Sequence, residues 1–196
     1  MQIEAQGQNM PGKWKSLKGK LLLDGGSLNG SFFHRTVVLI CQHDENGAFG
    51  LVLNKASAKK IADVMAATLP DRLREQLLFV GGPVQPNVVS FLHTDALLPD
   101  GTIIPNLALG QSLDQLIEIG ESYSPTKKAR IFAGYAGWSA GQLDSEMDRK
   151  AWLTHPASLE LVFDANPDTL WRDILLQKNE PLLRLLADSP EDLSWN

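Results

Sequence analysis

The stretch TVVLICQHDENGAFGLVL, residues 36–53, predicts a β-hairpin and decides the fold class. Its two arms, Thr36–Gln42 and Phe49–Leu53, are β-branched and apolar, as expected of strands. The linking segment His43–Gly47 contains an Asn-Gly pair, which readily takes the positive φ angles that a tight hairpin requires. Both arms are apolar at nearly every position. We therefore expect the hairpin to lie in the middle of a sheet that is covered on both faces.

Further strands and helices are predicted on either side of this hairpin. Strands are expected at 21–23, 77–80, 88–92, 129–136 and 159–163. Helices are expected at 58–69, after Ser112, at 140–150 and from Pro167 onward, the last with Leu170, Trp171, Ile174 and Leu175 on one face. Hairpins mix with helices instead of alternating strictly, which favours an α+β fold over a doubly wound parallel sheet.

Length and composition predict one domain with its own core. The chain has 196 residues, and we expect residues 1–17 to form a flexible basic arm and residues 18–196 to form the domain. The single cysteine, Cys41, excludes a disulfide framework and lies in an apolar run, so we expect an inert core thiol. No signal-peptide core and no apolar run near the ~20 residues of a membrane helix is present. We expect a cytoplasmic protein without membrane contact.

Charge is unevenly distributed along the chain, whose formal net charge is -5. Residues 1–20 contain four lysines and one glutamate, whereas the segment from Asp144 to the end contains eleven acids and five bases. This acidic balance disfavours direct DNA binding by the body of the protein. The arm around Lys13–Lys20 leaves a DNA-binding regulator as an alternative.

The segment Gly137–Gly141 fits the G-x-S-x-G pattern of serine hydrolases and lies between a predicted strand and a predicted helix. An acid and a histidine must follow the serine, and Asp144 and His155 are available. However, His155 comes only sixteen residues after Ser139, which leaves no room for the intervening strands. A tight turn is the favoured interpretation, and a hydrolase that uses Ser139 stays an alternative.

Metal and cofactor motifs are not evident. Two histidines stand near acids, in His43-Asp44 and in His93-Thr94-Asp95, but without metal-ligand spacing. The glycine pairs at 25–26 and 81–82 complete neither a Walker A motif nor a dinucleotide motif. We therefore expect no catalytic residue, no metal and no cofactor.

Three ordered motifs resemble the AlgH/YqgE family of bacterial proteins. They are 33–54, then Gly81–Val84, then 134–138 with Gly141–Leu143, Glu146 and Trp152. The resemblance implies a mixed, largely antiparallel, bifurcated or barrel-like sheet surrounded by helices. Family members are uncharacterised and carry the label of transcriptional regulator. This chain departs from the family pattern at Phe49, at Asp144 and at Ser139, where other residues are common.

These observations favour a non-enzymatic binding or regulatory protein that acts through an unknown protein partner or small ligand. We expect a monomer or weak homo-oligomer. The predicted site is the surface where the hairpin turn, the 81–83 turn and the aromatic corner at 134–142 could converge, because small residues beside aromatic ones permit close approach. Its residues are His43, Asp44, Gly81, Gly82, Pro83, Tyr135, Gly137, Trp138 and Gln142.

Overall fold

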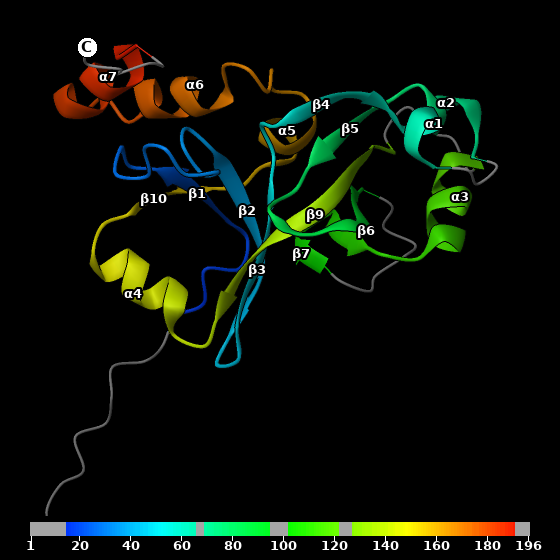
Figure 1. The fold of residues 1–196 in the computed structure, drawn as a ribbon, viewed down its shortest axis with the longest axis horizontal. Coiled ribbons are helices and arrows are strands. Elements are labelled where there is room, and N and C mark those ends of the chain that lie inside the picture. The colour runs from blue at the N-terminus through cyan, green and yellow to red at the C-terminus, as the bar shows by residue number, and fades with distance from the viewer. Residues whose placement is uncertain (1–14, 66–68, 95–101, 122–126, 191–196) are drawn as a thin grey trace, which may run out of the picture.

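A computed structural model describes residues 15–65, 69–94, 102–121 and 127–190. In these residues a curled, largely antiparallel half-barrel sheet is surrounded by helices, which confirms the predicted single α+β domain (Figure 1). The strands are β1 (Lys20–Asp24), β2 (Val37–Asp44), β3 (Gly47–Val52), β4 (Ala56–Lys60), β5 (Leu77–Val80), β6 (Val84–His93), β7 (Thr102–Ile104), β8 (Leu107–Gly110), β9 (Ala129–Ser139) and β10 (Trp152–Pro156). The helices are α1 (Ile61–Val64), α2 (Asp71–Arg74), α3 (Leu113–Glu121), α4 (Gln142–Asp148), α5 (Leu159–Phe163), α6 (Leu170–Gln177) and α7 (Pro181–Asp188).

Strand β9 belongs to two parts of the sheet. The main order is β10-β1-β2-β3-β9-β6-β8-β7, and β5 joins β9 in a parallel pairing while also pairing with β4. The late half of β9 pairs with β3, and its early half pairs with β6 and β5. The sheet therefore divides along β9, which crosses the middle of the molecule in Figure 1.

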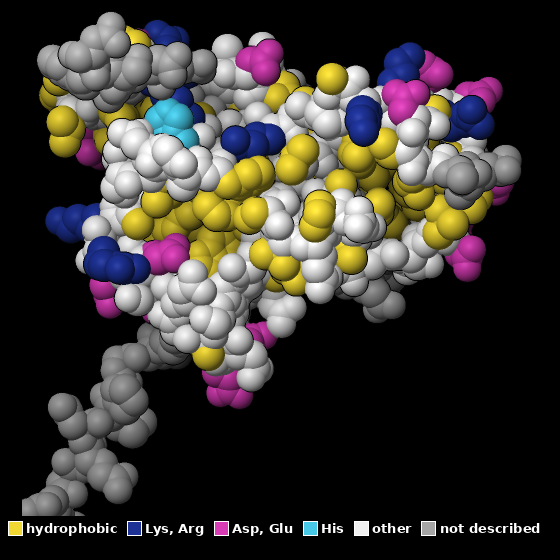
Figure 2. All heavy atoms as spheres, viewed as in Figure 1, with side chains coloured by type: hydrophobic (Ala, Val, Ile, Leu, Met, Phe, Trp, Pro, Cys, Tyr) yellow, Lys and Arg dark blue, Asp and Glu magenta, His cyan; other side chains and the backbone are white. Residues whose placement is uncertain are grey.

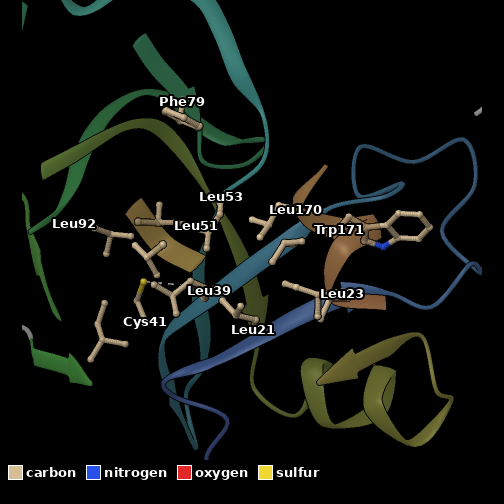
Figure 3. Close-up of a cluster of buried hydrophobic side chains, with 14 of the residues drawn as sticks. Leu21, Leu23, Leu39, Cys41, Leu51, Leu53, Phe79, Leu92, Leu170 and Trp171 are labelled. Atoms are coloured by element: carbon tan, nitrogen blue, oxygen red, sulfur yellow. Dashed lines mark hydrogen bonds between the residues drawn. The ribbon is translucent and has the colours of Figure 1, made fainter. Parts of the chain in front are cut away.

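The predicted hairpin is confirmed as β2 and β3, and it is closed by the pair Asp44 and Gly47. It is central, with β1 on one side and β9 on the other. One face of β1, β2 and β3 packs against α5, α6 and α7; Figure 3 shows its leucines pointing toward Leu170 and Trp171 of α6. The other face packs with Trp138, Trp152 and the buried Leu143 of α4.

Cys41 lies in the first of these clusters and is 4% exposed. Burial raises the pKa of its thiol, because an apolar environment disfavours the thiolate. Both observations agree with the expected inert core cysteine.

Two predicted elements are wrong. The helix expected at 58–69 begins only at Ile61, because residues 56–60 form β4 and pair with β5; residues 66–68 lie outside the described residues. The strand expected at 159–163 is the helix α5, capped by Ser158, whose Oγ accepts a hydrogen bond from the Leu161 N–H. Short apolar runs do not distinguish a strand from a buried helix.

Other predicted elements hold, with changed ends. The helices after Ser112, at 140–150 and from Pro167 appear as α3, α4 and α6, and the four residues expected on one face of α6 are all buried. Strands β6 and β9 are longer than expected, whereas β7, β8, β10, α2 and α7 were not predicted. In the described part of the chain, no helix is long and apolar enough to cross a membrane.

The segment after β5 crosses β9 at very short range. Gly81 donates from its N–H to the Ala133 carbonyl and accepts from the Val52 N–H, both at 2.9 Å. A Cβ on Gly82 would lie 2.0 Å from the carbonyl carbon of Tyr135, and one on Gly81 would lie 2.3 Å from the Gly134 oxygen. Only glycine fits, because the opposing atoms are backbone and cannot rotate away.

We expect Gly82→Ala to lower the free energy of unfolding by at least about 2 kcal/mol, because the sheet must shift to admit the methyl group. Gly30→Ala is the control. Gly30 has a φ of +76° but no neighbouring atom within 4 Å, so backbone strain alone should cost about 1 kcal/mol. Urea unfolding measures both. Equal costs would show that the crossing is not tightly packed.

Candidate functional site

The structure brings the three predicted segments to one strand. Gly47 of the hairpin turn pairs with Ser139 at the end of β9, and Ala48 pairs with Trp138. The 81–82 segment lies against β9 nearer its middle, beside Gly134 and Tyr135. The space beside Gly81 and Gly82 is thus filled by the backbone of β9.

His43 joins the hairpin to the segment that precedes β1. Its Nδ1 accepts a hydrogen bond from the Leu17 N–H at 3.0 Å, and its carbonyl accepts one from Ser16 Oγ at 2.8 Å. Its Nε2 lies 3.6 Å from Asp144 Oδ1. His43 as a residue is 5% exposed, so its contacts are internal. Residues 1–14 of the predicted arm lie outside the described residues.

Asp44 organises the turn itself. Hydrogen bonds from the Gln42 amide and from the Asn46 backbone N–H lower the pKa of its carboxyl group. The side chain is at the surface, so its effect on stability is small.

Trp138 and Gln142 belong to a hydrogen-bond network around Glu146. The indole N–H groups of Trp138 and Trp152 both donate to Glu146 Oε2, at 2.9 and 2.8 Å, and Gln142 Nε2 donates to Oε1 at 3.0 Å. The ring of Phe33 stacks on Trp138 with its centroid 6.3 Å away. Trp138 is 7% exposed. Its ring therefore fastens α4 and β10 to β9 and offers little contact area to a partner.

Within the described ranges, Ser139 bonds to an amide side chain and to no histidine or carboxylate. In the described residues, its Oγ hydrogen-bonds to Gln142 Oε1 at 3.2 Å, and that amide oxygen also accepts from the Ser139 N–H. His155 lies on β10, separated from β9 by β1, β2 and β3. Burial, and then the charges of Lys178 and Lys20, lower the pKa of His155.

A polar cleft of about 590 Å³ lies at the opposite, open end of the hairpin. There the chain enters β2 and leaves β3, and α6 and α7 form the facing wall. On the face shown in Figure 2, a histidine and Lys or Arg side chains lie beneath α6, above a hydrophobic patch over β2 and β3. We call this hollow the hairpin-end cleft; it is lined by His34, Arg35, Asn54, Lys55, Pro167, Asp168, Trp171, Arg172 and Ala187.

A buried carboxylate shapes one wall of the cleft. Asp24 Oδ1 accepts from the N–H groups of Gly26 and Leu28 at 2.8 and 3.2 Å, and Oδ2 accepts from the Arg35 N–H at 2.9 Å. Asp24 is fully buried at the end of β1. These bonds fold the loop back on itself and hold His34 and Arg35 at the cleft. His34 Nδ1 lies 3.5 Å from Asp24 Oδ2, without hydrogen-bond geometry, and is buried without a hydrogen-bond partner in the described residues.

Asn54 joins the two arms of the hairpin at this end. Its Oδ1 accepts from the Val37 N–H, and its Nδ2 donates to the Arg35 carbonyl, each at 2.8 Å. The next residue, Lys55, accepts a backbone hydrogen bond from Val80 at 2.8 Å. The segment that crosses β9 therefore also positions Lys55.

The cationic groups of the cleft differ in their contacts. Arg35 lies over the Trp171 ring and donates from Nη2 to the carbonyl groups of Ser189 and Pro190. Arg172 pairs with Asp188 at 2.7 Å. Lys55 Nζ lies 4.6 Å from the Phe32 ring centroid and has no hydrogen bond or ion pair within the described part of the chain.

A second hollow, of about 240 Å³, borders the predicted site. It contains Tyr135 and Gly134, together with Phe49, Gln85, Val88, Ser90 and Gln111. The Tyr135 ring packs on Phe49 with a centroid distance of 4.9 Å. Tyr135 is thus a predicted site residue that lies beside a hollow. Among the described residues, no group of three or more His, Cys, Asp or Glu side chains could hold a metal ion.

The AlgH-like family model matches residues 21–182. This chain belongs to the AlgH-like family. A UPF0301 protein of Chlamydia caviae is 41% identical over 183 residues, which cover 91% of this chain and 95% of that protein. A UPF0301 protein of Chlorobaculum tepidum is 38% identical over 186 residues, covering 93% and 97%.

Solved structures share the fold of this AlgH-like protein. The solution structure of AlgH from Pseudomonas aeruginosa has a TM-score of 0.71 at 32% identity and covers 91% of this chain and 98% of that one. A crystal structure of a protein from Corynebacterium diphtheriae has a TM-score of 0.74 at 26% identity, with coverages of 91% and 94%.

The hairpin-end cleft of this AlgH-like protein was missed from the sequence, although four of its residues lie within or directly after the first motif, 33–54. The sequence did contain a signal for part of this cleft. His34-Arg35 ends one residue before β2 and Asn54-Lys55 begins one residue after β3, and an antiparallel hairpin places its two outer ends side by side. The contribution of α6 could not be foreseen, because it comes from a segment more than a hundred residues away.

We expect Glu146→Gln to destabilise the protein by about 2 kcal/mol, since an amide cannot accept from both indoles and from Gln142 in the same geometry. Asp148→Asn, an exposed change on the same helix, should cost under about 0.5 kcal/mol. Guanidinium unfolding followed by tryptophan fluorescence measures both. Equal effects would refute a structural role for the network.

Proposed function

We propose that this protein is a cytoplasmic, non-enzymatic binding protein that takes a small ligand into the hairpin-end cleft and regulates a protein partner. The observation that carries the proposal is the cleft itself. It combines a volume of about 590 Å³, a lysine without a hydrogen bond or ion pair among the described residues, and a buried histidine nitrogen that makes no hydrogen bond there. Pockets for small molecules have volumes of about 300–1,000 Å³ and present a few polar groups.

The geometry around Ser139 supports a non-enzymatic role. A serine nucleophile needs a base within hydrogen-bond reach, and here the hydroxyl group is bonded to the amide of Gln142. Gln142 is itself bonded to Glu146, so the group beside Ser139 belongs to the network that fixes α4.

The regulatory part of the proposal rests on the label that the family resemblance carries. The candidate partner surface comprises the exposed Pro83, Gly137 and Gln142 of the predicted site, together with the half-buried Asp44. Asp44 and the hairpin-end cleft lie at opposite ends of the same hairpin. A ligand that stiffens the open end can therefore affect the turn end through β2 and β3. The basic arm at Lys13–Lys20 remains the route by which a DNA-binding role would act.

Native mass spectrometry of the protein purified from its host tests the ligand. We expect a bound small molecule on the wild-type protein and its loss from Asp168→Tyr, because the larger ring fills the cleft. Asp168→Asn keeps the size of the side chain and should retain the ligand. Loss from both variants, or from neither, would contradict binding in the cleft.

An alkyl fluorophosphonate tests the absence of serine chemistry. We expect no labelling of Ser139 above the level of the Ser139→Ala variant, as measured by intact-mass spectrometry, because no base activates the hydroxyl group. Stoichiometric labelling that is lost in Ser139→Ala would overturn the non-enzymatic assignment.

A further inference from the structure

We infer that the hairpin-end cleft binds a small molecule that carries two or more oxyanion groups, phosphate or carboxylate. The inference rests on the proposed function, because it names the chemistry of the ligand that the cleft takes. Among the described residues, Arg35, Lys55 and Arg172 bring guanidinium or ammonium groups to the cleft, and Asp168 brings a carboxylate. Two further carboxylates nearby are already engaged, because Asp24 is buried and bonded to backbone N–H groups and Asp188 is paired with Arg172. Lys55 is therefore a cation without an ion-pair partner among the described residues, in a chain whose net charge is -5.

Concave surfaces with one sign of charge and low-dielectric walls concentrate the field and attract ions of the opposite sign. The cleft has such walls, since Pro167, Trp171 and Ala187 lie between the charged groups. Its polar side chains come from two directions: Lys55 follows β3, and Arg172 lies on α6. A ligand with two anionic groups can contact both walls at once, so we expect it to bind more tightly than a single phosphate.

Lys55 is the main anchor. Its ammonium group lies over the ring of Phe32, and none of the described residues offers it a carboxylate or a carbonyl oxygen. A contact with a ring face leaves the other ammonium hydrogens available for charge-assisted bonds to an oxyanion. The carbonyl of Lys55 is held by the Val80 N–H, so the backbone that carries this side chain is fixed.

Arg172 can bind a ligand if its ion pair with Asp188 is replaced. Its ion pair with Asp188 is between two side chains that are 50% and 59% exposed, and such surface pairs contribute little. An oxyanion in the cleft can therefore take over one edge of the guanidinium. Arg35 plays a different part, since its guanidinium is bonded to Ser189 and Pro190 and lies over Trp171; it closes the cleft at one side and adds charge.

The size of the cleft favours a small anionic ligand over a larger polyanion. A volume of about 590 Å³ suits a molecule of tens of atoms. Nucleic acid would need an extended basic surface, whereas here the cations gather around one hollow between the hairpin and α6.

Isothermal titration calorimetry with tripolyphosphate and with citrate, at ionic strength held constant with potassium chloride, tests the inference. We expect saturable 1:1 binding of at least one of them, at least tenfold tighter than that of inorganic phosphate. Comparison of the two separates a preference for phosphate from one for carboxylate. Raising the salt concentration should weaken the binding.

Lys55→Met keeps the alkyl stem over Phe32 and should weaken binding at least tenfold. Lys59→Met removes the same charge from an exposed position on β4 and should change the affinity less than twofold. Arg172→Gln should weaken binding about fivefold, and Arg184→Gln, on α7, is its control. Circular dichroism and urea unfolding verify that each variant is folded.

Equal weakening by Lys55→Met and Lys59→Met would overturn the inference, because it would show nonspecific attraction. Failure of both tripolyphosphate and citrate to bind would also overturn the inference. If both probes fail while the host-purified protein carries a neutral ligand that Asp168→Tyr expels, the proposed function stands and the polyanion inference is wrong. If both probes fail and the host-purified protein also holds no ligand in the cleft, the proposed function and the polyanion inference are both wrong.

Discussion

The backbone of residues 80–82 passes between β3 and β9, and this crossing joins the two parts of the sheet to the segment that carries Lys55. Its hydrogen bonds reach Val52 at the end of β3, Ala133 in β9 and Lys55 after the hairpin. Glycine at 81 and 82 is a steric requirement, because the opposing atoms are the backbone of Gly134 and Tyr135. The crossing lets one long strand, β9, serve two parts of the sheet, and it also fixes the open end of the hairpin.

The two ends of the β2–β3 hairpin differ in what their polar groups do. At the turn end, His43, Asp44, Trp138 and Gln142 are bonded to their neighbours and stabilise the fold. At the open end the polar side chains divide into two groups. Asp24 and Asn54 hold the backbone there, while the charged side chains around them line the cleft.

The positive character of the cleft arises from distant parts of an acidic chain. The C-terminal segment has more acids than bases, yet α6 presents Arg172 to the cleft, and the segment after α7 accepts hydrogen bonds from Arg35. Packing of buried Leu170, Trp171 and Ile174 against β1, β2 and β3 sets which face of α6 is turned to the hairpin. Net charge therefore says little about the charge of a particular surface.

The sequence by itself determined the hairpin, the α+β class, the buried face of α6 and the family, because these follow from local turn chemistry, periodicity and ordered motifs. It did not determine β4 or α5, since short apolar runs fit either a strand or a helix until a neighbour such as β5 or a cap such as Ser158 is known. The sequence singled out the motif residues Gly81, Gly82, Trp138 and Gln142 for a site. It could not show that backbone fills the space beside the two glycines, or that the side chains of the other two bond within the protein. Only the tertiary structure decided that the hollow lies at the open end of the hairpin. Its walls join residues 34–55 to residues 167–187, and no local pattern encodes a contact across that separation.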